Sequence, residues 1–124
     1  MTLREAIERF DLLYPNALDL SAKRNIISAL DGRINSEILV NYGEGEADFC
    51  GYNETTPGET QLLAQFPFDD IYIKALCVEN DAVSGDIDRY NNSAEVFNLS
   101  WEQYAAYYNR TRRHRETKLL YPRR

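Results

Sequence analysis

The sequence is poor in the residues that most often carry chemistry. Of its 124 residues, two are cysteine and one is histidine. His114 lies among arginines near the C-terminus, where a general base would be solvated and without a supporting partner. Cys50 and Cys77 lack both a neighbouring histidine and partners at metal-ligand spacing, so they indicate reduced cytosolic thiols, not a disulfide framework. The sequence therefore predicts no catalytic site, no metal and no cofactor.

Long apolar runs and phosphate-binding loops are also missing. No apolar run approaches membrane-spanning length, and the first five residues carry no signal-peptide core. The segment Gly43-Glu44-Gly45-Glu46 is acidic and would repel phosphate. Asp81, Asp86 and Asp88 lack the alternating ligand spacing of a calcium loop, which favours a solvated helix face. We therefore expect no membrane association and no small-molecule substrate.

What the chain does have is a strong charge asymmetry. Residues 110–124 hold seven Lys or Arg and one acid, whereas the rest of the chain holds seven Lys or Arg and nineteen acids. Such a basic tail on an acidic body either meets nucleic acid or meets the acidic body of a neighbouring copy. We expect the tail at 111–124 to be partly disordered. The candidate residues for nonspecific DNA or partner contact are Arg110, Arg112, Arg113, Arg115 and Lys118.

Two short helices are predicted in the first third of the chain. Thr2 followed by Glu5 has the capping-box spacing, and Pro15 stops a helix over about Leu3–Leu13. Ser21 opens a second helix, predicted from about 22 to 40, because Ile26, Ile27, Leu30, Ile34, Ile38 and Leu39 recur at helical spacing. Lys23, Arg24, Asp31, Arg33 and Glu37 are expected on the outside of this helix. Gly32 within it indicates either a close helix contact or a tolerated exposed glycine.

Helical periodicity disappears between Asn41 and Thr60. This stretch is rich in glycine and acidic residues, which predicts a long acidic loop or a small hairpin at about 43–66. A hairpin would pair Ala47–Tyr52 with Gln61–Phe66. A connection of this length is usually functional or disordered. It could therefore be an arm that orders against a partner, or a solvated loop.

A regular apolar stripe dominates the remaining chain. Apolar or aromatic residues recur every three or four positions from Tyr72 to Tyr108, which predicts an amphipathic helix. The stripe keeps its phase across Gly85 and across Asn91-Asn92, which favours one continuous helix over two segments that meet at a bend near Asn91. At about 55 Å, this helix would be longer than a monomer of this size can cover. Part of the stripe should then face another subunit, and the candidate interface residues are Tyr90, Phe97, Trp101, Tyr104 and Tyr108.

The predicted fold is therefore all-α. Two shorter helices pack on one long C-terminal helix. This long helix is either continuous or bent near Asn91. The helical domain covers residues 1–110, and the basic tail follows it at 111–124.

Several short runs along the chain form a recognisable set. The runs are Leu30-Asp31-Gly32-Arg33-Ile34 with Glu37, Phe68-Asp69-Asp70-Ile71-Tyr72, Asp88-Arg89-Tyr90-Asn91-Asn92-Ser93, Phe97-Asn98 and Tyr107-Tyr108-Asn109-Arg110. Together they resemble a small virion protein of tailed phages and prophages of Gram-positive bacteria. The resemblance extends from the first helix to Arg110, and its residues are packing and interface residues.

This family is the head–tail connector, or head-completion, class. The resemblance implies a non-enzymatic helical subunit that assembles as a ring under the portal, with the portal and tail-completion proteins as partners and genome DNA passing through. It also implies assembly in the bacterial host cytoplasm and then a place at the head–tail junction of the virion. Family members end soon after the Asn-Arg pair, so the resemblance implies no role for residues 111–124. The alternative is a small regulatory or nucleic-acid-binding protein that acts through its basic tail.

Overall fold

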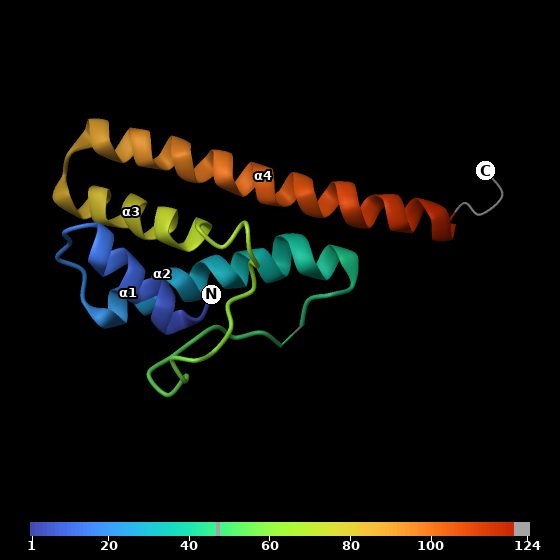
Figure 1. Ribbon diagram of the computed structural model, residues 1–124, viewed down its shortest axis with the longest axis horizontal. Coiled ribbons are helices and arrows are strands. Elements are labelled where there is room, and N and C mark those ends of the chain that lie inside the picture. Colours follow the sequence, from blue (N-terminus) through green and yellow to red (C-terminus); the bar gives the residue numbers. More distant parts are fainter. Residues whose placement is uncertain (47, 121–124) are drawn as a thin grey trace.

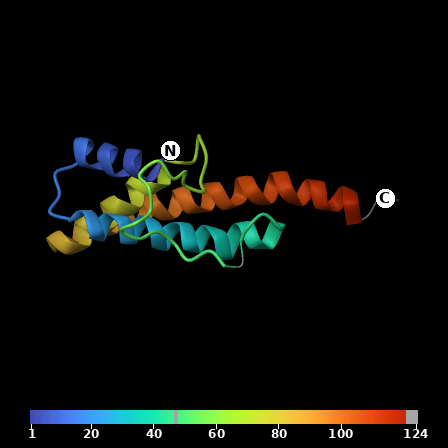
Figure 2. The same ribbon diagram turned by 90° about the horizontal axis from the view of Figure 1, so that it is seen from below.

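The computed structural model describes the backbone of residues 1–46 and 48–120, and the side chains of residues 1–46 and 48–111. Within these residues the protein is all-α, with four α-helices and no strand. The one strand-like feature is an isolated antiparallel bridge between Thr2 and Gln61. Figures 1 and 2 show an elongated molecule in which the α3–α4 hairpin lies against α1 and α2, and α4 continues past the other helices.

Helix α1 (Leu3–Leu13) begins and ends as predicted. The Thr2 hydroxyl accepts from the Glu5 amide, and the Glu5 carboxylate accepts from the Thr2 amide, which completes the capping box. This arrangement satisfies two of the amides that a helix N-terminus leaves without partners. Leu3, Ile7 and Phe10 are buried, so one face of α1 packs against the body.

The second helical segment is longer than predicted and changes its winding. Helix α2 (Leu20–Ile34) is capped by Asp19, whose carboxylate accepts from the Ala22 amide, so the prediction that Ser21 opens the helix is wrong. The π-helical turn η1 (Asn35–Leu39) and the 3₁₀ turn η2 (Val40–Tyr42) continue the helix to Gly43. A Cβ at Gly32 would meet nothing within 4 Å, so Gly32 is the tolerated glycine of the two alternatives.

Two charged residues of α2 expected outside are inside. Lys23 is 7 % exposed, and its ammonium pairs with the Asp11 carboxylate of α1 at 2.5 Å. Asp31 is 0 % exposed. Both lie four residues from Ile27, which is itself fully buried, so the helical period places all three on the inner face.

The connection between η2 and α3 forms no hairpin in its described residues, 43–46 and 48–70. It runs beside the N-terminus, where the Leu3 amide donates to the Thr60 carbonyl and the Leu62 amide donates to the Met1 carbonyl. Leu62 and Ala64 are buried in the core. The connection is therefore a packed part of its own subunit over this stretch.

The continuous helix predicted across Gly85 is wrong. Helix α3 (Ile71–Ser84) ends at Gly85, which has a φ of +80°, and α4 (Ile87–Leu120) runs back along α3 (Figure 1). Glycine adopts this left-handed conformation without the steric cost that a Cβ brings. The Asp86 carboxylate then accepts from the Arg89 amide and caps α4. Asn91 and Asn92 lie inside α4, so the bend considered there is absent.

This reversal removes the length argument for a helix shared with a neighbour. The stripe is divided between two antiparallel helices of one chain, and much of it covers the subunit's own core. Tyr72, Leu76 and Tyr104 are all buried within this core, together with Phe10, Ile27 and Ile34.

Candidate functional site

The first candidates for a chemical site are the acidic and cysteine side chains of the described residues. Among them, no group of three or more His, Cys, Asp or Glu side chains could hold a metal ion. None of the helices described is both long enough and apolar enough to span a bilayer. Cys50 and Cys77 are free thiols, and burial raises the pKa of Cys77, which keeps it protonated and unreactive. His114 lies outside the residues whose side chains are described.

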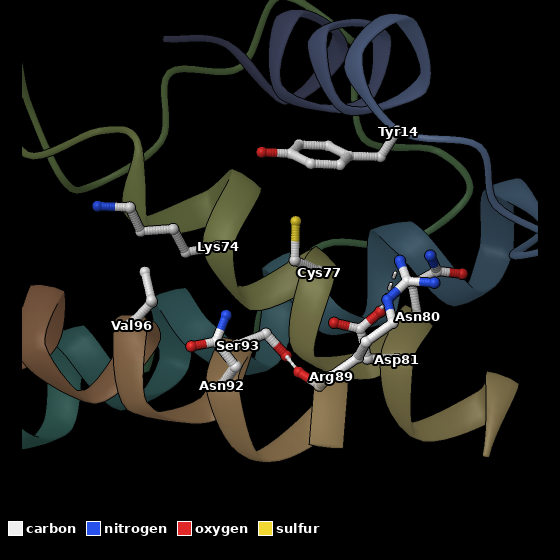
Figure 3. A pocket seen from close by; sticks show the side chains of 9 residues that line it. All are labelled: Tyr14, Lys74, Cys77, Asn80, Asp81, Arg89, Asn92, Ser93 and Val96. Atoms are coloured by element: carbon white, nitrogen blue, oxygen red, sulfur yellow. Dashed lines mark hydrogen bonds and ion pairs between the residues drawn. The ribbon is translucent and has the colours of Figure 1, made fainter. Parts of the chain in front are cut away.

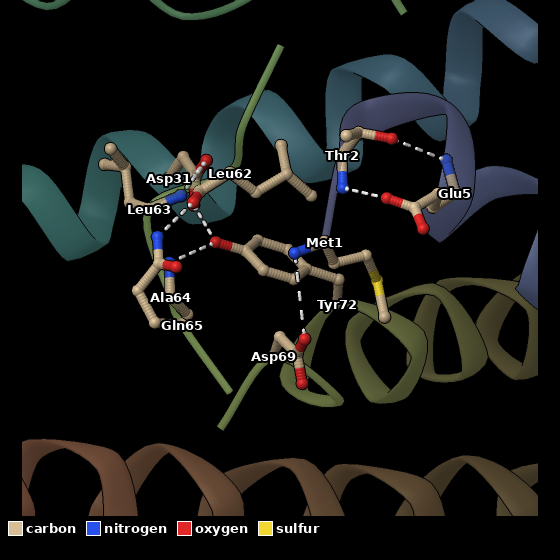
Figure 4. Close-up of polar contacts among 10 residues, drawn as sticks. All are labelled: Met1, Thr2, Glu5, Asp31, Leu62, Leu63, Ala64, Gln65, Asp69 and Tyr72. Carbon is tan, nitrogen blue, oxygen red and sulfur yellow. Dashed lines mark hydrogen bonds and ion pairs between the residues drawn. The ribbon is translucent and has the colours of Figure 1, made fainter. Parts of the chain in front are cut away.

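The most constrained polar group is the buried carboxyl of Asp31 (Figure 4). Its Oδ1 accepts a hydrogen bond from the Tyr72 hydroxyl at 2.5 Å, and its Oδ2 accepts one from the Tyr52 hydroxyl at 2.5 Å. The Leu63 amide also donates to Oδ2, at 3.2 Å. A buried carboxyl needs such partners because burial without hydrogen bonds costs several kcal/mol. Asp31 therefore ties α2, α3 and the connection together.

The hydroxyl of Tyr72 extends this network. It donates to Asp31 and accepts from the Ala64 amide at 2.7 Å. Burial, reinforced by the nearby Asp31 carboxylate, raises the pKa of Tyr72, and the same causes raise that of Tyr52. Both tyrosines therefore remain protonated donors. We call Asp31, Tyr52, Tyr72 and the Leu63 and Ala64 amides the Asp31 hub, and every polar group of the hub has a partner, so its role is structural.

Four of the five candidate interface residues pack within their own subunit. Tyr104 is 3 % exposed, and its ring lies 5.6 Å from the ring of Phe68. Phe97, Trp101 and Tyr108 are partly buried against the core. The guanidinium of Arg33 lies 3.9 Å from the centre of the Trp101 ring, a cation–π contact that covers the indole. The buried Tyr104 ring is therefore not available to a neighbour.

Tyr108 belongs to a cluster of aromatic rings where α4 passes η2 and the start of α3, formed with Tyr42, Phe68, Tyr104 and Tyr107. Its ring lies 5.7 Å from the ring of Tyr42, and its hydroxyl donates to the Glu44 carboxylate at 3.2 Å. The Tyr42 hydroxyl in turn donates to Asn109 at 3.0 Å. These contacts fasten α4 to η2.

Tyr90 is the candidate interface residue that remains outside. It is 38 % exposed on the first turn of α4, near the exposed turn at Gly85. Sequence reasoning did not single out three other exposed apolar residues: Val83 and Ile87 are 67 % and 73 % exposed, and Leu12 of α1 is 86 % exposed. The signal for Val83 and Ile87 was the Gly85-Asp86 pair between them, a glycine with positive φ followed by the residue that caps α4.

A pocket of about 260 Å³ lies beside this turn, between α1, α3 and α4 (Figure 3). Tyr14 and Cys77 form part of its wall, and Asp81 pairs with Arg89 at 3.4 Å on its edge. The Asn80 amide donates to the Pro15 carbonyl at 3.3 Å, which joins the end of α1 to α3. Asp81 is 8 % exposed, so its predicted place on a solvated face is wrong.

The basic candidate residues are placed only in part. Arg110 is exposed near the end of the described side chains. Arg112, Arg113, Arg115 and Lys118 lie on the backbone of α4, but their side chains are outside the described set. The interpretation of these residues as DNA or partner contacts stays a prediction.

Comparisons with known proteins identify no relative for this arrangement. No protein-family model, curated protein or solved structure matches the chain.

Proposed function

We propose that the protein is a non-enzymatic head–tail connector subunit of a tailed phage or prophage. The proposal rests on the resemblance of its short sequence runs to that class of virion protein. In this role the subunit forms a ring beneath the portal and binds the portal and tail-completion proteins. Its partners assemble with it in the bacterial host cytoplasm and stay with it at the head–tail junction.

One structural observation supports this proposal: the separated runs that carry the resemblance contact one another. Asp31, from the first run, accepts from Tyr72, from the second. The ring of Phe68, also in the second, lies 4.8 Å from the ring of Tyr107, in the last. Residues far apart in sequence thus form one packing scheme, as expected if they define a common fold.

The acidic body suits a subunit that surrounds moving DNA. Residues 1–109 carry nineteen acids and seven Lys or Arg. An acidic wall repels the DNA backbone and keeps it from binding as it passes. If exposed body acids are exchanged for lysine, DNA ejection should slow, and unchanged ejection would count against an acidic inner wall.

The decisive experiment is binding to the portal protein encoded by the same genome. We expect the purified chain to be retained on immobilised portal and to raise the mass of the portal ring by several subunits. Particles made without this chain should contain DNA-filled heads and separate tails, as seen by electron microscopy. Normal tailed particles in its absence would overturn the proposal.

The matched control tests the alternative role. The full chain and a chain stopped at Asn109 are compared for retention on duplex DNA at physiological salt. Retention at micromolar levels that requires residues 110–124, without portal binding, would favour a nucleic-acid-binding protein over a connector.

A further inference from the structure

The described residues include eleven exposed large apolar side chains, and six of them belong to residues 12–14 and 83–90, at one end of the molecule. The C-terminal end of α1 and the α3–α4 turn lie at this end (Figure 1), joined by the hydrogen bond from Asn80 to Pro15. We call the following exposed residues the apolar end: Leu12, Leu13, Tyr14, Val83, Ile87 and Tyr90. Clustered exposed apolar side chains of this kind mark interaction surfaces.

The apolar end is hollowed in two places. Asp81 belongs to the lining of both: the pocket of about 260 Å³ in Figure 3, and a second pocket of about 210 Å³ that is also lined by Ala82, Ile87 and Tyr90. Both are smaller than the roughly 300 Å³ at which small-molecule sites begin. Their size and apolar lining suit single side chains of a protein partner.

The segments that form this end are acidic, although Lys74 and Arg89 line the pocket of Figure 3 together with Asp81. The two segments that form this end, 11–20 and 79–90, contain six acids and one arginine. Glu79 and Asp88 are exposed. The partner should therefore combine positive charge with a few apolar side chains. This charge argues against nucleic acid and against an anionic membrane surface, since both would be repelled.

The chain itself contains a segment of that composition. Residues 110–124 carry seven Lys or Arg and one acid, and they include Leu119, Leu120 and Tyr121. Helix α4 spans 34 residues, or about 51 Å, and its last residues, 110–120, lie at the end of the molecule opposite the apolar end (Figures 1 and 2). A chain therefore cannot place this segment on its own apolar end.

We infer that the apolar end of one copy receives the basic C-terminal segment, residues 110–124, of a second copy. Such a head-to-tail contact is heterologous, so it joins unlike surfaces and can close into a ring. Symmetric pairing of two apolar ends would instead bring their acids together. The inference shares one premise with the proposed function, namely that copies of this chain assemble with one another. It adds the contact through which they join.

A charge exchange between full-length chains tests this contact. In the receptor variant, Glu79→Lys and Asp88→Lys reduce the net charge of segments 11–20 and 79–90 from −5 to −1. In the donor variant, Arg112→Glu, Arg113→Glu and Lys118→Glu reduce the net charge of residues 110–124 from +6 to 0. Sedimentation of the wild type should show association that weakens by about tenfold or more from about 0.05 to about 0.5 M salt, since salt screens such pairs.

Each variant alone should associate at least about tenfold more weakly than the wild type, because one of the two contact surfaces has lost most of its charge. An equimolar mixture should associate again as pairs, because the unchanged segment of the receptor variant then finds the unchanged apolar end of the donor variant. Loss in both variants with recovery in the mixture supports the contact. Wild-type association in either variant, no recovery in the mixture, or a monomeric wild type at low salt would overturn it.

Cross-linking identifies the occupant. A photoreactive residue at position 87 of the full chain should join to peptides within 110–124 of a second copy. Cross-links from position 87 to position 87 would show symmetric pairing and overturn the inference. Ile87→Ser should weaken association at least about tenfold, as expected from removing a buried contact residue, whereas Leu99→Ser, at a residue 56 % exposed elsewhere on α4, should not.

These outcomes are separable from those of the proposed function. A chain that binds the portal but fails the charge exchange keeps the connector role and loses this contact. A chain that passes the charge exchange but ignores the portal keeps the contact and loses the connector role.

Discussion

The Asp31 hub and the apolar end are opposite exceptions to the rule that polar side chains are exposed and apolar side chains are buried. At the hub a carboxyl is fully buried, and three donors surround it. At the apolar end, Leu12 and Ile87 are largely exposed. Side-chain polarity alone would assign each of them to the opposite place. Asp31 can be buried because hydrogen-bond donors are available to its carboxyl. The side chains beside Gly85 are exposed because the chain reverses there and nothing in the described residues covers them.

The largest expected effect comes from removing the acceptor of the hub. Asp31→Ala leaves two tyrosine hydroxyls and the Leu63 amide without their acceptor, so the free energy of unfolding should fall by about 3–5 kcal/mol. Asp31→Asn keeps the shape and one acceptor oxygen, and should cost less. Urea denaturation measures both. Equal stability of the alanine variant and the wild type would show that the hub does not stabilise the fold.

The hub should also give stability a distinctive pH dependence. Burial raises the pKa of Asp31 and outweighs the hydrogen bonds from Tyr52, Tyr72 and Leu63, which lower it. The raised pKa of Asp31 contributes to the free energy of unfolding in full below the ordinary aspartate pKa of about 3.9. This contribution is lost as the pH rises from there through the pKa of Asp31 in the folded protein, because Asp31 releases its proton at a lower pH in the unfolded chain.

The stability difference between the wild type and Asp31→Asn isolates this effect. The difference should shift in favour of the variant as the pH rises from about 4. Asp11, Glu5 and Glu59 have lowered pKa values and give the opposite slope, but they are present in both proteins and cancel. A difference independent of pH would contradict the raised pKa of Asp31.

Two glycines with equally open surroundings test the chain reversal. A Cβ at either Gly32 or Gly85 meets nothing within 4 Å, but Gly85 has a φ of +80° whereas Gly32 lies within α2. Gly85→Ala should destabilise the protein by about 1–2 kcal/mol, and Gly32→Ala should stabilise it by about 0.4–1 kcal/mol. Thermal unfolding measures both signs. A stabilised Gly85→Ala variant would mean that the helix continues through this position.

The smallest expected effect on stability lies at the apolar end. Ile87→Ala should change the free energy of unfolding by no more than about 0.5 kcal/mol. The same substitution at Ile27, which is 0 % exposed, should cost about 2–5 kcal/mol. Denaturation at low protein concentration keeps self-association out of the measurement. A large cost at Ile87 would mean that this residue is covered within its own subunit.

Local signals predicted the first helix well and the second in outline. The capping box of Thr2 and Glu5 and the stop at Pro15 act within a few residues, so the sequence is sufficient to place α1. The polarity of Asp31 predicts an exposed side chain, whereas its position in the helical repeat of apolar residues predicts a buried one, and the repeat is correct. Asp31 follows Ile27 by four residues and precedes Ile38 by seven, which is the period of the buried face.

The turn at Gly85 was missed for a different reason. The stripe keeps its phase through Val83, Ile87 and Tyr90, but these three residues face solvent and take no part in the core. Continuity of an apolar pattern is evidence for one helix only where the pattern is buried. The tertiary contacts that would have revealed this, such as the pairing of Asp81 with Arg89 across the turn, are not visible in sequence.

The π-helical turn at Asn35–Leu39 has a consequence for how this chain tolerates change in length. A turn of this kind is what one extra residue leaves inside an α-helix, and here it brings both Ile38 and Leu39 into the core. Deleting one residue from this turn would restore ordinary winding and rotate the rest of this helical segment, Val40–Tyr42, by about 100°. Tyr42 would then swing away from Tyr108 and Asn109, and α4 would lose that fastening. A single-residue deletion here would therefore break a contact between parts of the chain far apart in sequence, whereas the same deletion in an exposed loop would be local.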